Sequence, residues 1–387
     1  MSSEDADKVK ESVKDYYGNK LKCSDDLQSN ACKLGDTMSP AVKSALKLIH
    51  EEVSSKFYGC GLVASEALEG MYILDLGSGS GMDSFVVSKF VGENGHVTGV
   101  DMTKEQVDIA NKYVAYHAEQ FGYSKPNTDF KIGEIERLSD VGIQDNSMDI
   151  IISNGVVNLT ADERVVLKEA HRVLKDGGEV YFSDVYTDTN LSEEARNDQM
   201  LWCECVSGAL HWKELVELCK DVGFCGPYLV TARPLVVEPK LRRLLGDAQF
   251  VSATYRLFKV PQDSKTDGSR VTYKGSMEST PDEFKFNVHN TLTKTPKIVS
   301  AAVASVLGAS RFSKHLEFHP LEPGTAAPAD DVDSEADPFA YCASNDVAPG
   351  GCCAKPAKQE SCCVKPAEQE NGCCPKRAKT ESEGRCC

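Results

Sequence analysis

Short apolar runs alternate with amphipathic stretches through the first part of the chain. Five runs have the length and character of buried strands, and they lie near residues 72–76, 97–101, 130–132, 149–154 and 179–184. Apolar residues recur at helical spacing in the intervening segments and again over 191–210 and 211–222, which predicts helices there. Strands that alternate with helices predict an α/β fold with a doubly wound, mainly parallel sheet. Ligands of such sheets bind beyond the carboxyl ends of the strands.

The pattern changes after residue 231. Strands are expected over 250–258, 270–274 and 284–288, followed by a helix over 297–310, and few of these residues could do chemistry. The sequence therefore predicts four parts. These are N-terminal helices and cysteine-bearing loops (1–60), the main α/β domain (61–231), a smaller C-terminal α+β domain that supports the fold or forms a dimer (232–322), and a disordered tail (323–387).

Charge and cysteine content narrow the class of protein. The formal net charge is −16, which argues against nucleic acid or an anionic membrane as a partner. The N-terminus lacks an apolar signal segment, and the longest apolar run is too short to span a bilayer, so a cytoplasmic protein is expected. Sixteen cysteines in a reducing compartment favour soft-metal or redox chemistry over structural disulfides.

A glycine turn follows the first strand of the main domain. The segment 75–81 reads Asp-Leu-Gly-Ser-Gly-Ser-Gly, and Asp101 ends the next strand. Glycines let the backbone approach a ligand closely, and an acid at this second strand end accepts hydrogen bonds from ribose hydroxyls in nucleotide-binding folds. A plain surface turn would also use glycine. In this strand–turn–helix setting the segment resembles motif I of the class I S-adenosylmethionine methyltransferases, so Asp75, Gly77 and Gly79 are expected to approach the methionine part of that cofactor.

The tail carries a degenerate repeat of adjacent cysteines with a period near ten residues. Paired thiols on a flexible chain chelate soft metal ions, although an idle tail of easily oxidised cysteines is the alternative. The candidate metal ligands are Cys352, Cys353, Cys362, Cys363, Cys373 and Cys374.

The body of the chain resembles the S-adenosylmethionine-dependent arsenite methyltransferases. The resemblance rests on Tyr58–Leu62, Ile73–Gly81, Gly95–Thr103, Tyr181–Tyr186 and Gly208–Leu215, and it continues through Phe250–Phe258 to about residue 320. It implies a class I methyltransferase that moves a methyl group from S-adenosylmethionine to thiol-bound trivalent arsenic, in arsenite or methylarsenite. The implied products are mono- and dimethylated arsenicals, formed in arsenic detoxification with glutathione or thioredoxin as the thiol reductant.

The same resemblance implies roles for particular residues. Cys32, Cys60 and Cys205 match family active-site cysteines, and Cys60 and Cys205 are the expected arsenic ligands. The remaining expected contacts are with the cofactor: Tyr58 beside the sulfonium (or only packing), Asp101 at the ribose, Met102, Ile135 and Glu136 at the adenine, and Asn154 at the methionine end.

The chemistry of arsenic agrees with this residue set. Trivalent arsenic carries a lone pair, so the reaction needs no general base, only soft ligands that aim the lone pair at the methyl carbon. The fourth family cysteine is missing, because Gly155 stands in its place. Cys203 could replace it, although two residues two apart on a helix point in different directions. Alternatively Cys32, Cys60 and Cys205 still supply three thiols, or methylarsenite, with one valence already filled by carbon, is the better substrate.

Two rival functions remain open from the residues. A class I methyltransferase of another small molecule would explain the glycine turn but would leave Cys60 and Cys205 without a role. A catalytically weakened protein that binds soft metals or arsenic through its tail would give no methylated product.

Overall fold

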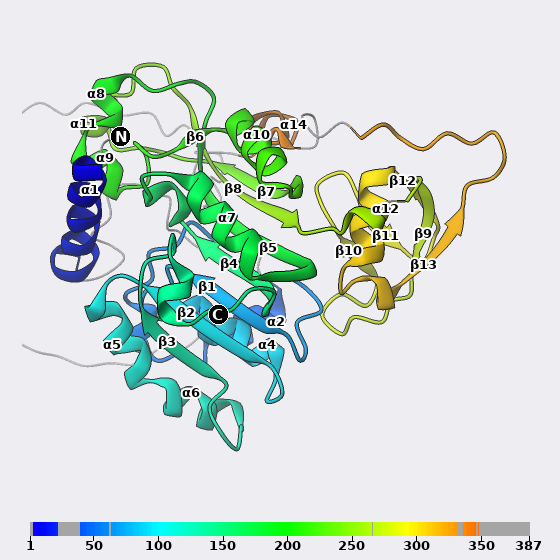
Figure 1. Ribbon diagram of the computed structural model, residues 1–387, viewed down its shortest axis with the longest axis horizontal. Coiled ribbons are helices and arrows are strands. Elements are labelled where there is room, and N and C mark those ends of the chain that lie inside the picture. The colour runs from blue at the N-terminus through cyan, green and yellow to red at the C-terminus, as the bar shows by residue number, and fades with distance from the viewer. Residues whose placement is uncertain are drawn as a thin grey trace, which may run out of the picture. The chain divides into compact units, whose positions relative to one another are not determined.

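The structure is a computed structural model (Figure 1) that describes residues 3–21, 39–61, 63–264, 266–330, 336–345 and 347. Cys32 and the six candidate tail cysteines, Cys352, Cys353, Cys362, Cys363, Cys373 and Cys374, lie outside the described residues. Within the part of the chain that is described, none of the helices is both long enough and apolar enough to cross a membrane.

An eight-stranded sheet forms the centre of the main domain. Its order is β3-β2-β1-β4-β5-β8-β7, with β6 paired to β5. The strands are β1 Tyr72–Leu76, β2 His96–Asp101, β3 Thr128–Ile132, β4 Met148–Asn154, β5 Leu174–Thr187, β6 Leu210–His211, β7 Cys225–Pro234 and β8 Phe250–Phe258. All pairs are parallel except those of β8 with β5 and β7. The predicted mainly parallel α/β sheet is confirmed.

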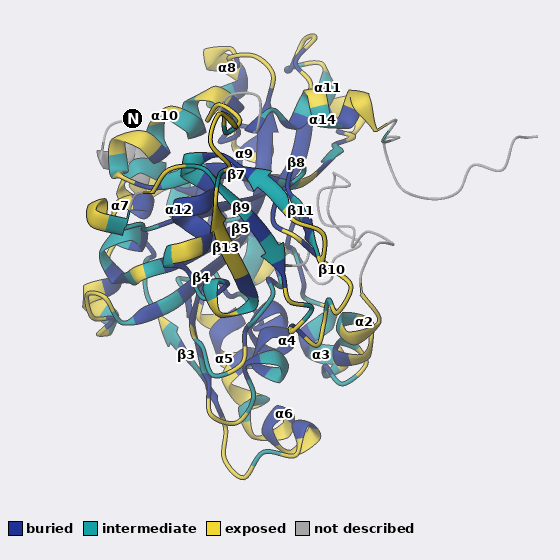
Figure 2. Cartoon of the chain, turned by 90° about the vertical axis from the view of Figure 1, so that its right-hand side faces the viewer, coloured by how far each residue is buried: buried dark blue, intermediate teal, exposed yellow. Residues whose placement is uncertain are grey.

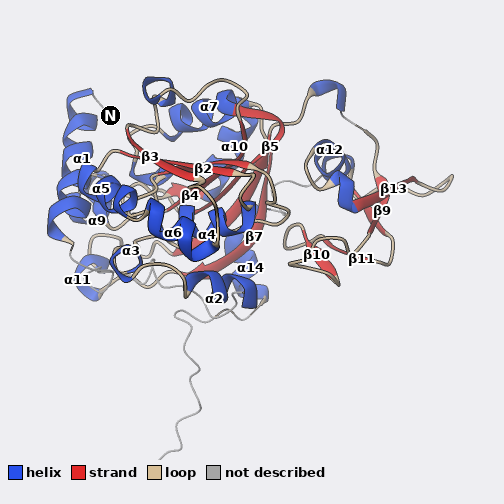
Figure 3. Cartoon of the chain, turned by 90° about the horizontal axis from the view of Figure 1, so that it is seen from below, coloured by secondary structure: helices blue, strands red, loops and turns tan. Residues whose placement is uncertain are grey.

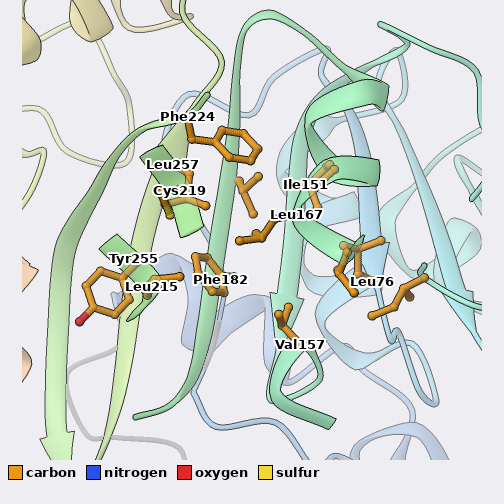
Figure 4. Close-up of a cluster of buried hydrophobic side chains, with 14 of the residues drawn as sticks. Leu76, Ile151, Val157, Leu167, Phe182, Leu215, Cys219, Phe224, Tyr255 and Leu257 are labelled. Atoms are coloured by element: carbon orange, nitrogen blue, oxygen red, sulfur yellow. The ribbon is translucent and has the colours of Figure 1, made fainter. Parts of the chain in front are cut away.

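Helices cover both faces of this sheet (Figure 3). They are α4 Met82–Val91, α5 Lys104–Lys112, α6 Val114–Phe121, α7 Glu163–Val173 and α10 Trp212–Val222. Neighbouring residues of β4 face opposite sides, because strand side chains alternate. Ile151 packs with Leu167 of α7, in the core cluster that Figure 4 shows, whereas Ile150 packs with Val87 of α4. Most central-strand residues are accordingly buried (dark blue in Figure 2).

The strand order reverses between β1 and β4. The chain runs outward from β1 through β2 to β3 and then returns to β4 on the other side of β1. At such a switch point the loops after the two strands diverge and leave a crevice at the carboxyl ends. The predicted glycine turn lies there, directly after β1.

The smaller C-terminal unit consists of antiparallel sheets and a helix. β10 Glu283–Lys285 pairs with β11 Thr291–Thr293, and β9 Ser269–Tyr273 lies between β12 Lys297–Val299 and β13 Leu316–Pro320, beside α12 Ala301–Ala309. The strand 250–258, assigned to this unit from its sequence, is instead β8 of the central sheet. Its nine residues are all buried, as expected of a strand between two others.

A buried ionic cluster joins the two units. Arg256 of β8 has no exposed side-chain surface, and its guanidinium lies 2.5 Å from Glu66 and 3.5 Å from Glu179, whose side chain is also fully buried. Arg311 of the smaller unit reaches the same Glu179 carboxylate at 2.6 Å. The aromatic ring of Phe312 lies 5.4 Å from the Arg256 guanidinium carbon. Removal of one charge from this cluster would leave another buried without compensation.

The predicted tail begins later than residue 323 suggests. Residues Pro338–Ser344 form helix α14, which packs with β7 and β8. The Tyr255 hydroxyl donates a hydrogen bond to the Ala336 carbonyl at 2.7 Å, and the Cys342 side chain is buried in the main core. Apolar Phe339, Tyr341 and Cys342 supply the contact surface that the polar composition of this region had obscured.

The N-terminal residues form helix α1 Ser3–Asp15, the π-helical turn η1 Tyr16–Lys20, α2 Pro40–Leu46 and α3 Glu51–Ser54. Val13 and Tyr16 are buried in the same apolar cluster as Cys60 and Cys205, together with residues of the short helices α8 Glu193–Arg196 and α9 Gln199–Cys203. The predicted continuous helix over 191–210 is therefore wrong. Two short helices and a turn occupy that segment.

Candidate active site

A cavity of about 950 Å³, its open mouth included, lies at the carboxyl ends of β1, β2 and β4. All nine residues expected to contact the cofactor line it: Tyr58, Asp75, Gly77, Gly79, Asp101, Met102, Ile135, Glu136 and Asn154. The sequence could indicate these residues because most of them end a strand or belong to the turn that follows one.

Asp101 fixes the shape of the glycine turn. One carboxylate oxygen accepts the backbone N–H of Gly79 at 2.9 Å, and the other accepts that of Thr103 at 2.7 Å. Gly77 has a φ of +70°, and a Cβ there would lie 2.4 Å from Val156, so only glycine fits. Each Asp101 oxygen keeps a second lone pair for a hydroxyl of a ligand. Burial raises the pKa of Asp101, an effect that its two backbone donors partly offset.

Two further carboxyl groups face the floor of the cavity. Burial raises the pKa of Asp75 to about 8 and that of Asp83 to about 7. Asp75 accepts a hydrogen bond from Ser84 at 2.6 Å, and Asp83 accepts one from the Asn154 amide at 2.6 Å. A cationic ligand would stabilise the ionised form of both groups. Asp83 was missed in the sequence, although an acid two residues after a glycine turn, at the start of a helix, is a signal that could have pointed to it.

Four cavity-lining side chains also present a buried polar atom without a hydrogen-bond partner within the described structure. They are Ser78 Oγ, Asp83 Oδ1, Gln106 Oε1 and Asn154 Oδ1. Unsatisfied buried polar atoms are costly, so a group of them around one cavity fits a polar ligand there. Three of the four are hydrogen-bond acceptors, which suits the amino group and hydroxyls of an amino-acid nucleoside such as S-adenosylmethionine.

The N-terminal segment closes one side of the cavity. The Lys10 ammonium lies 2.5 Å from the Glu134 carboxylate and 3.1 Å from that of Glu136. Tyr17 of η1 also lines the cavity, with its ring 5.5 Å from the ring of Tyr58. Neither Lys10 nor Tyr17 was expected at the site, because no local pattern shows that the first helix folds back over the strand ends.

Cys60 and Cys205 converge on the backbone of Gly155. A Cβ on Gly155 would lie 2.9 Å from the Cys60 sulfur, and the Cys205 sulfur lies 3.4 Å from the Gly155 carbonyl oxygen. Both cysteine side chains are buried, with 1% and 2% of their surface exposed. Gly155 itself lines the cavity. One small residue thus separates the two sulfur atoms from each other and borders the space beside them.

The backbone conformation at Cys205 explains where its sulfur atom points. Helix α9 ends at Cys203, and Cys205 takes a left-handed conformation with φ +62°. This conformation costs a residue other than glycine about 1–2 kcal/mol. The Cys203 sulfur points instead toward the Ser12 carbonyl, 3.9 Å away, and burial raises its pKa to about 11. The Cys203 sulfur therefore lies at the Ser12 carbonyl, whereas the Cys205 sulfur lies at the Gly155 carbonyl.

A dedicated metal-binding cluster is absent from the described part of the chain, where no three His, Cys, Asp or Glu side chains are arranged to hold an ion. The placement of Cys32 relative to Cys60 and Cys205 lies outside the described residues. Among the cysteines that the structure describes, Cys60 and Cys205 are the two whose sulfur atoms lie next to Gly155 at the edge of the cavity.

Comparison with known proteins identifies the family. Residues 67–223 match a methyltransferase domain, and residues 266–367 match the arsenite methyltransferase C-terminal domain. The arsenite methyltransferase of Mus musculus is 45% identical over 370 residues, which cover 92% of this chain and 98% of the mouse protein. That of Aquipseudomonas alcaligenes is 44% identical over 314 residues, 80% of this chain and 90% of the relative.

A solved structure shows the same architecture. The arsenic(III) S-adenosylmethionine methyltransferase of Chlamydomonas reinhardtii is similar with a TM-score of 0.71 and 40% identity, over 76% of this chain and all of the algal one. Relatives of similar length, a matching C-terminal domain and a shared fold all indicate the same family. This chain belongs to the arsenite methyltransferase family.

Proposed function

We propose that this protein methylates trivalent arsenic held by the thiols of Cys60 and Cys205. The observation that carries the proposal is the convergence of these two buried sulfur atoms on Gly155, a residue that lines the cofactor cavity. Thiolates are soft ligands and suit a soft semimetal, whereas the carboxylates of the cavity are hard ligands.

The cavity residues hold the methyl donor. S-adenosylmethionine, when bound, supplies a methyl group activated by its sulfonium. Asp101 would accept hydrogen bonds from the ribose hydroxyls, and Asp75 and Asp83 would stabilise the positive charge of the methionine part. The apolar Met102 and Ile135 would pack against the adenine. The aromatic ring of Tyr58, which lines the cavity, would stabilise the sulfonium by a cation–π interaction.

The thiol pair has a positioning task rather than an acid–base task. The arsenic lone pair is itself the nucleophile, so what limits the reaction is its orientation toward the methyl carbon. Cys60 is held in place through its carbonyl, which accepts hydrogen bonds from Ser252 at 2.8 Å and Arg233 at 3.1 Å. A thiol on such a fixed backbone fixes the arsenic it binds.

The glycine at position 155 makes methylarsenite the preferred substrate. Inorganic arsenite needs three thiol ligands to displace all of its oxygen ligands, and methylarsenite needs two, because one valence is filled by carbon. Cys60 and Cys205 supply two. Cys32, which matches the third family cysteine, completes the set for arsenite or forms a disulfide with another active-site thiol. Oxidation of the two thiols to this disulfide would supply the two electrons that return arsenic oxidised by methyl transfer to the trivalent state. Glutathione or thioredoxin in the cytoplasm would then reduce the disulfide back to two thiols.

Serine substitutions test the proposal directly. Cys60→Ser and Cys205→Ser should abolish formation of dimethylated arsenic from methylarsenite, measured as separated arsenic species after incubation with cofactor and reductant. Cofactor affinity, measured by calorimetry, should stay within about twofold, because neither sulfur lines the cofactor cavity. Cys225→Ser is a matched control, since Cys225 begins β7 away from Gly155. Retained turnover in both active-site variants would refute the proposal.

A second candidate function rests on the paired cysteines of the tail, which favour binding of soft metal ions. A deletion of residues 352–387, which leaves helix α14 intact, distinguishes the methyltransferase from a metal-binding protein. An enzyme should keep its turnover after this deletion and a metal buffer should lose its capacity for cadmium or arsenite.

A further inference from the structure

The last residue of α9 and the two residues that follow it, segment 203–205, each accept a hydrogen bond from a side chain far away in the sequence. The Tyr17 hydroxyl donates to the Cys203 carbonyl at 2.8 Å, and the Tyr16 hydroxyl donates to the Glu204 carboxylate at 2.6 Å. The Asn158 amide donates to the Cys205 carbonyl at 2.9 Å. Side chains from two elements thus hold the segment 203–205 residue by residue.

The segment needs such support because of its backbone. Helix α9 could continue through residue 205 if only local forces acted, but Cys205 has a left-handed φ of +62°. Each further helical residue turns the side-chain direction by about 100°. A relaxation of the turn toward helix would therefore rotate the Cys205 sulfur away from the Gly155 carbonyl, where it now lies.

Tyr17 occupies the junction between this turn and the cofactor cavity. Its hydroxyl oxygen, besides donating to Cys203, lies 3.9 Å from the Cys205 sulfur. Its own carbonyl accepts a hydrogen bond from the cavity residue Gln106 at 2.9 Å, and its ring lies 5.5 Å from that of Tyr58. The position of the hydroxyl is therefore set by the cavity wall and by the π-helical turn η1, a form of helix often found at functional sites.

We propose that Tyr17 is a positioning residue that keeps the Cys205 sulfur aimed at Gly155, and so prepares the thiol pair for the arsenical. This role rests on the proposed function of Cys60 and Cys205 as arsenic ligands. The N-terminal segment then serves arsenic capture as well as closing the cofactor cavity. Asn158 supports the same turn from the opposite side, and its own backbone N–H is held by the Asp184 carboxylate at 3.1 Å.

The test uses Tyr17→Phe in the full-length protein without cofactor and with a phosphine in place of a thiol reductant. Methylarsenite is titrated and followed by tryptophan fluorescence, since Trp202 lies next to the turn. We expect affinity about fivefold weaker than in the wild type, which equals about 1 kcal/mol at 1.4 kcal/mol per tenfold. In turnover, KM for methylarsenite should rise by a similar factor. Cofactor affinity should change by no more than about twofold, because the Tyr17 ring that lines the cavity is kept, and Tm should fall by no more than about 2 °C, the effect of one lost hydrogen bond in a chain of this size.

Two further variants make the result decisive. Asn158→Leu removes the amide donor with little change of shape and adds no charge beside the Asp184 carboxylate, and it should also weaken methylarsenite binding. Tyr123→Phe is the matched control, because the Tyr123 hydroxyl donates to backbone carbonyls of Ser88 and Lys89 away from the cavity. It should bind methylarsenite like the wild type.

The possible failures are distinguishable. If Cys205→Ser loses affinity for methylarsenite and Tyr17→Phe does not, the positioning role is overturned and the proposed function stands. If Cys205→Ser binds as tightly as the wild type, the proposed function is overturned, and the positioning role with it. A parallel loss of Tm and cofactor affinity in Tyr17→Phe would show a general structural role and would also overturn the proposal.

Discussion

Introducing a cysteine at position 155 should give this protein more efficient use of inorganic arsenite. A Cβ added at Gly155 would lie 2.9 Å from the Cys60 sulfur, and the Cys205 sulfur lies 3.4 Å from the carbonyl oxygen of the same residue. The Cys60 side chain would have to shift slightly to admit this Cβ, and a sulfur atom attached to it would lie close to the existing thiols. Gly155→Cys therefore builds a third arsenic ligand into the site.

The size of the expected gain in arsenite turnover depends on where the third thiol ligand comes from. In the wild type, a third thiol has to come from solution or from another part of the chain. A tethered thiol has an effective concentration of about 10 mM or higher, so against about 1 mM glutathione we expect roughly a tenfold gain, about 1.4 kcal/mol. We expect this gain in the ratio of two specificity constants, kcat/KM for arsenite over kcat/KM for methylarsenite. The left-handed φ of +69° at residue 155 opposes it with a stability loss of about 1–2 kcal/mol, seen as a Tm lower by a few degrees.

The assay compares both substrates in separate incubations and identifies the arsenic species formed. Gly155→Ala is the matched control, because it has the same backbone strain and the same Cβ but no sulfur. Excess reductant keeps a disulfide between Cys60 and the new cysteine from forming. If Gly155→Cys and Gly155→Ala show the same ratio of arsenite to methylarsenite turnover, the idea that a missing thiol sets the substrate preference is refuted.

Three other predictions concern the cofactor cavity and the ionic cluster. Asp101→Ala should weaken cofactor binding by roughly ten- to hundredfold in calorimetry while the protein stays folded, because charged hydrogen bonds contribute about 1.5–3 kcal/mol; unchanged binding would remove Asp101 from the site. Glu179→Ala should lower the free energy of unfolding in urea by about 3–5 kcal/mol, since the buried Arg256 and Arg311 each lose a carboxylate, and Glu66 alone is left to compensate Arg256. The exposed control Glu322→Ala should cost about 0–1 kcal/mol. The pKa values of Asp75 and Asp83 are raised by folding, so the cofactor-free protein should lose stability as pH rises toward about 7 and 8. A cationic cofactor offsets this loss, so its stabilising effect on Tm should grow between pH 6 and pH 8.5; an effect independent of pH would contradict the assignment.

The sequence by itself determined the elements that depend only on residues close together in the chain. A short apolar run and the glycine turn after it define β1, the turn and the start of α4 within a single short segment. The end of β2 follows in the same unit, which is why Asp101 could be placed beside the turn before any fold was known. Parallel strands then bring their carboxyl ends to one edge, so the cavity-lining residues share a location that follows from their positions in the strands.

Only the tertiary structure decided which distant segments meet. The left-handed turn at Cys205 breaks a segment whose residues favour helix, because hydrogen bonds from Tyr17 and Asn158 act on it across the fold. In the same way β8 joins the central sheet, and α14 covers the main core, through contacts that no short pattern encodes. The approach of Cys60 and Cys205 to Gly155 depends on packing of this non-local kind, so the pairing of the two sulfur atoms became visible only once the chain was folded.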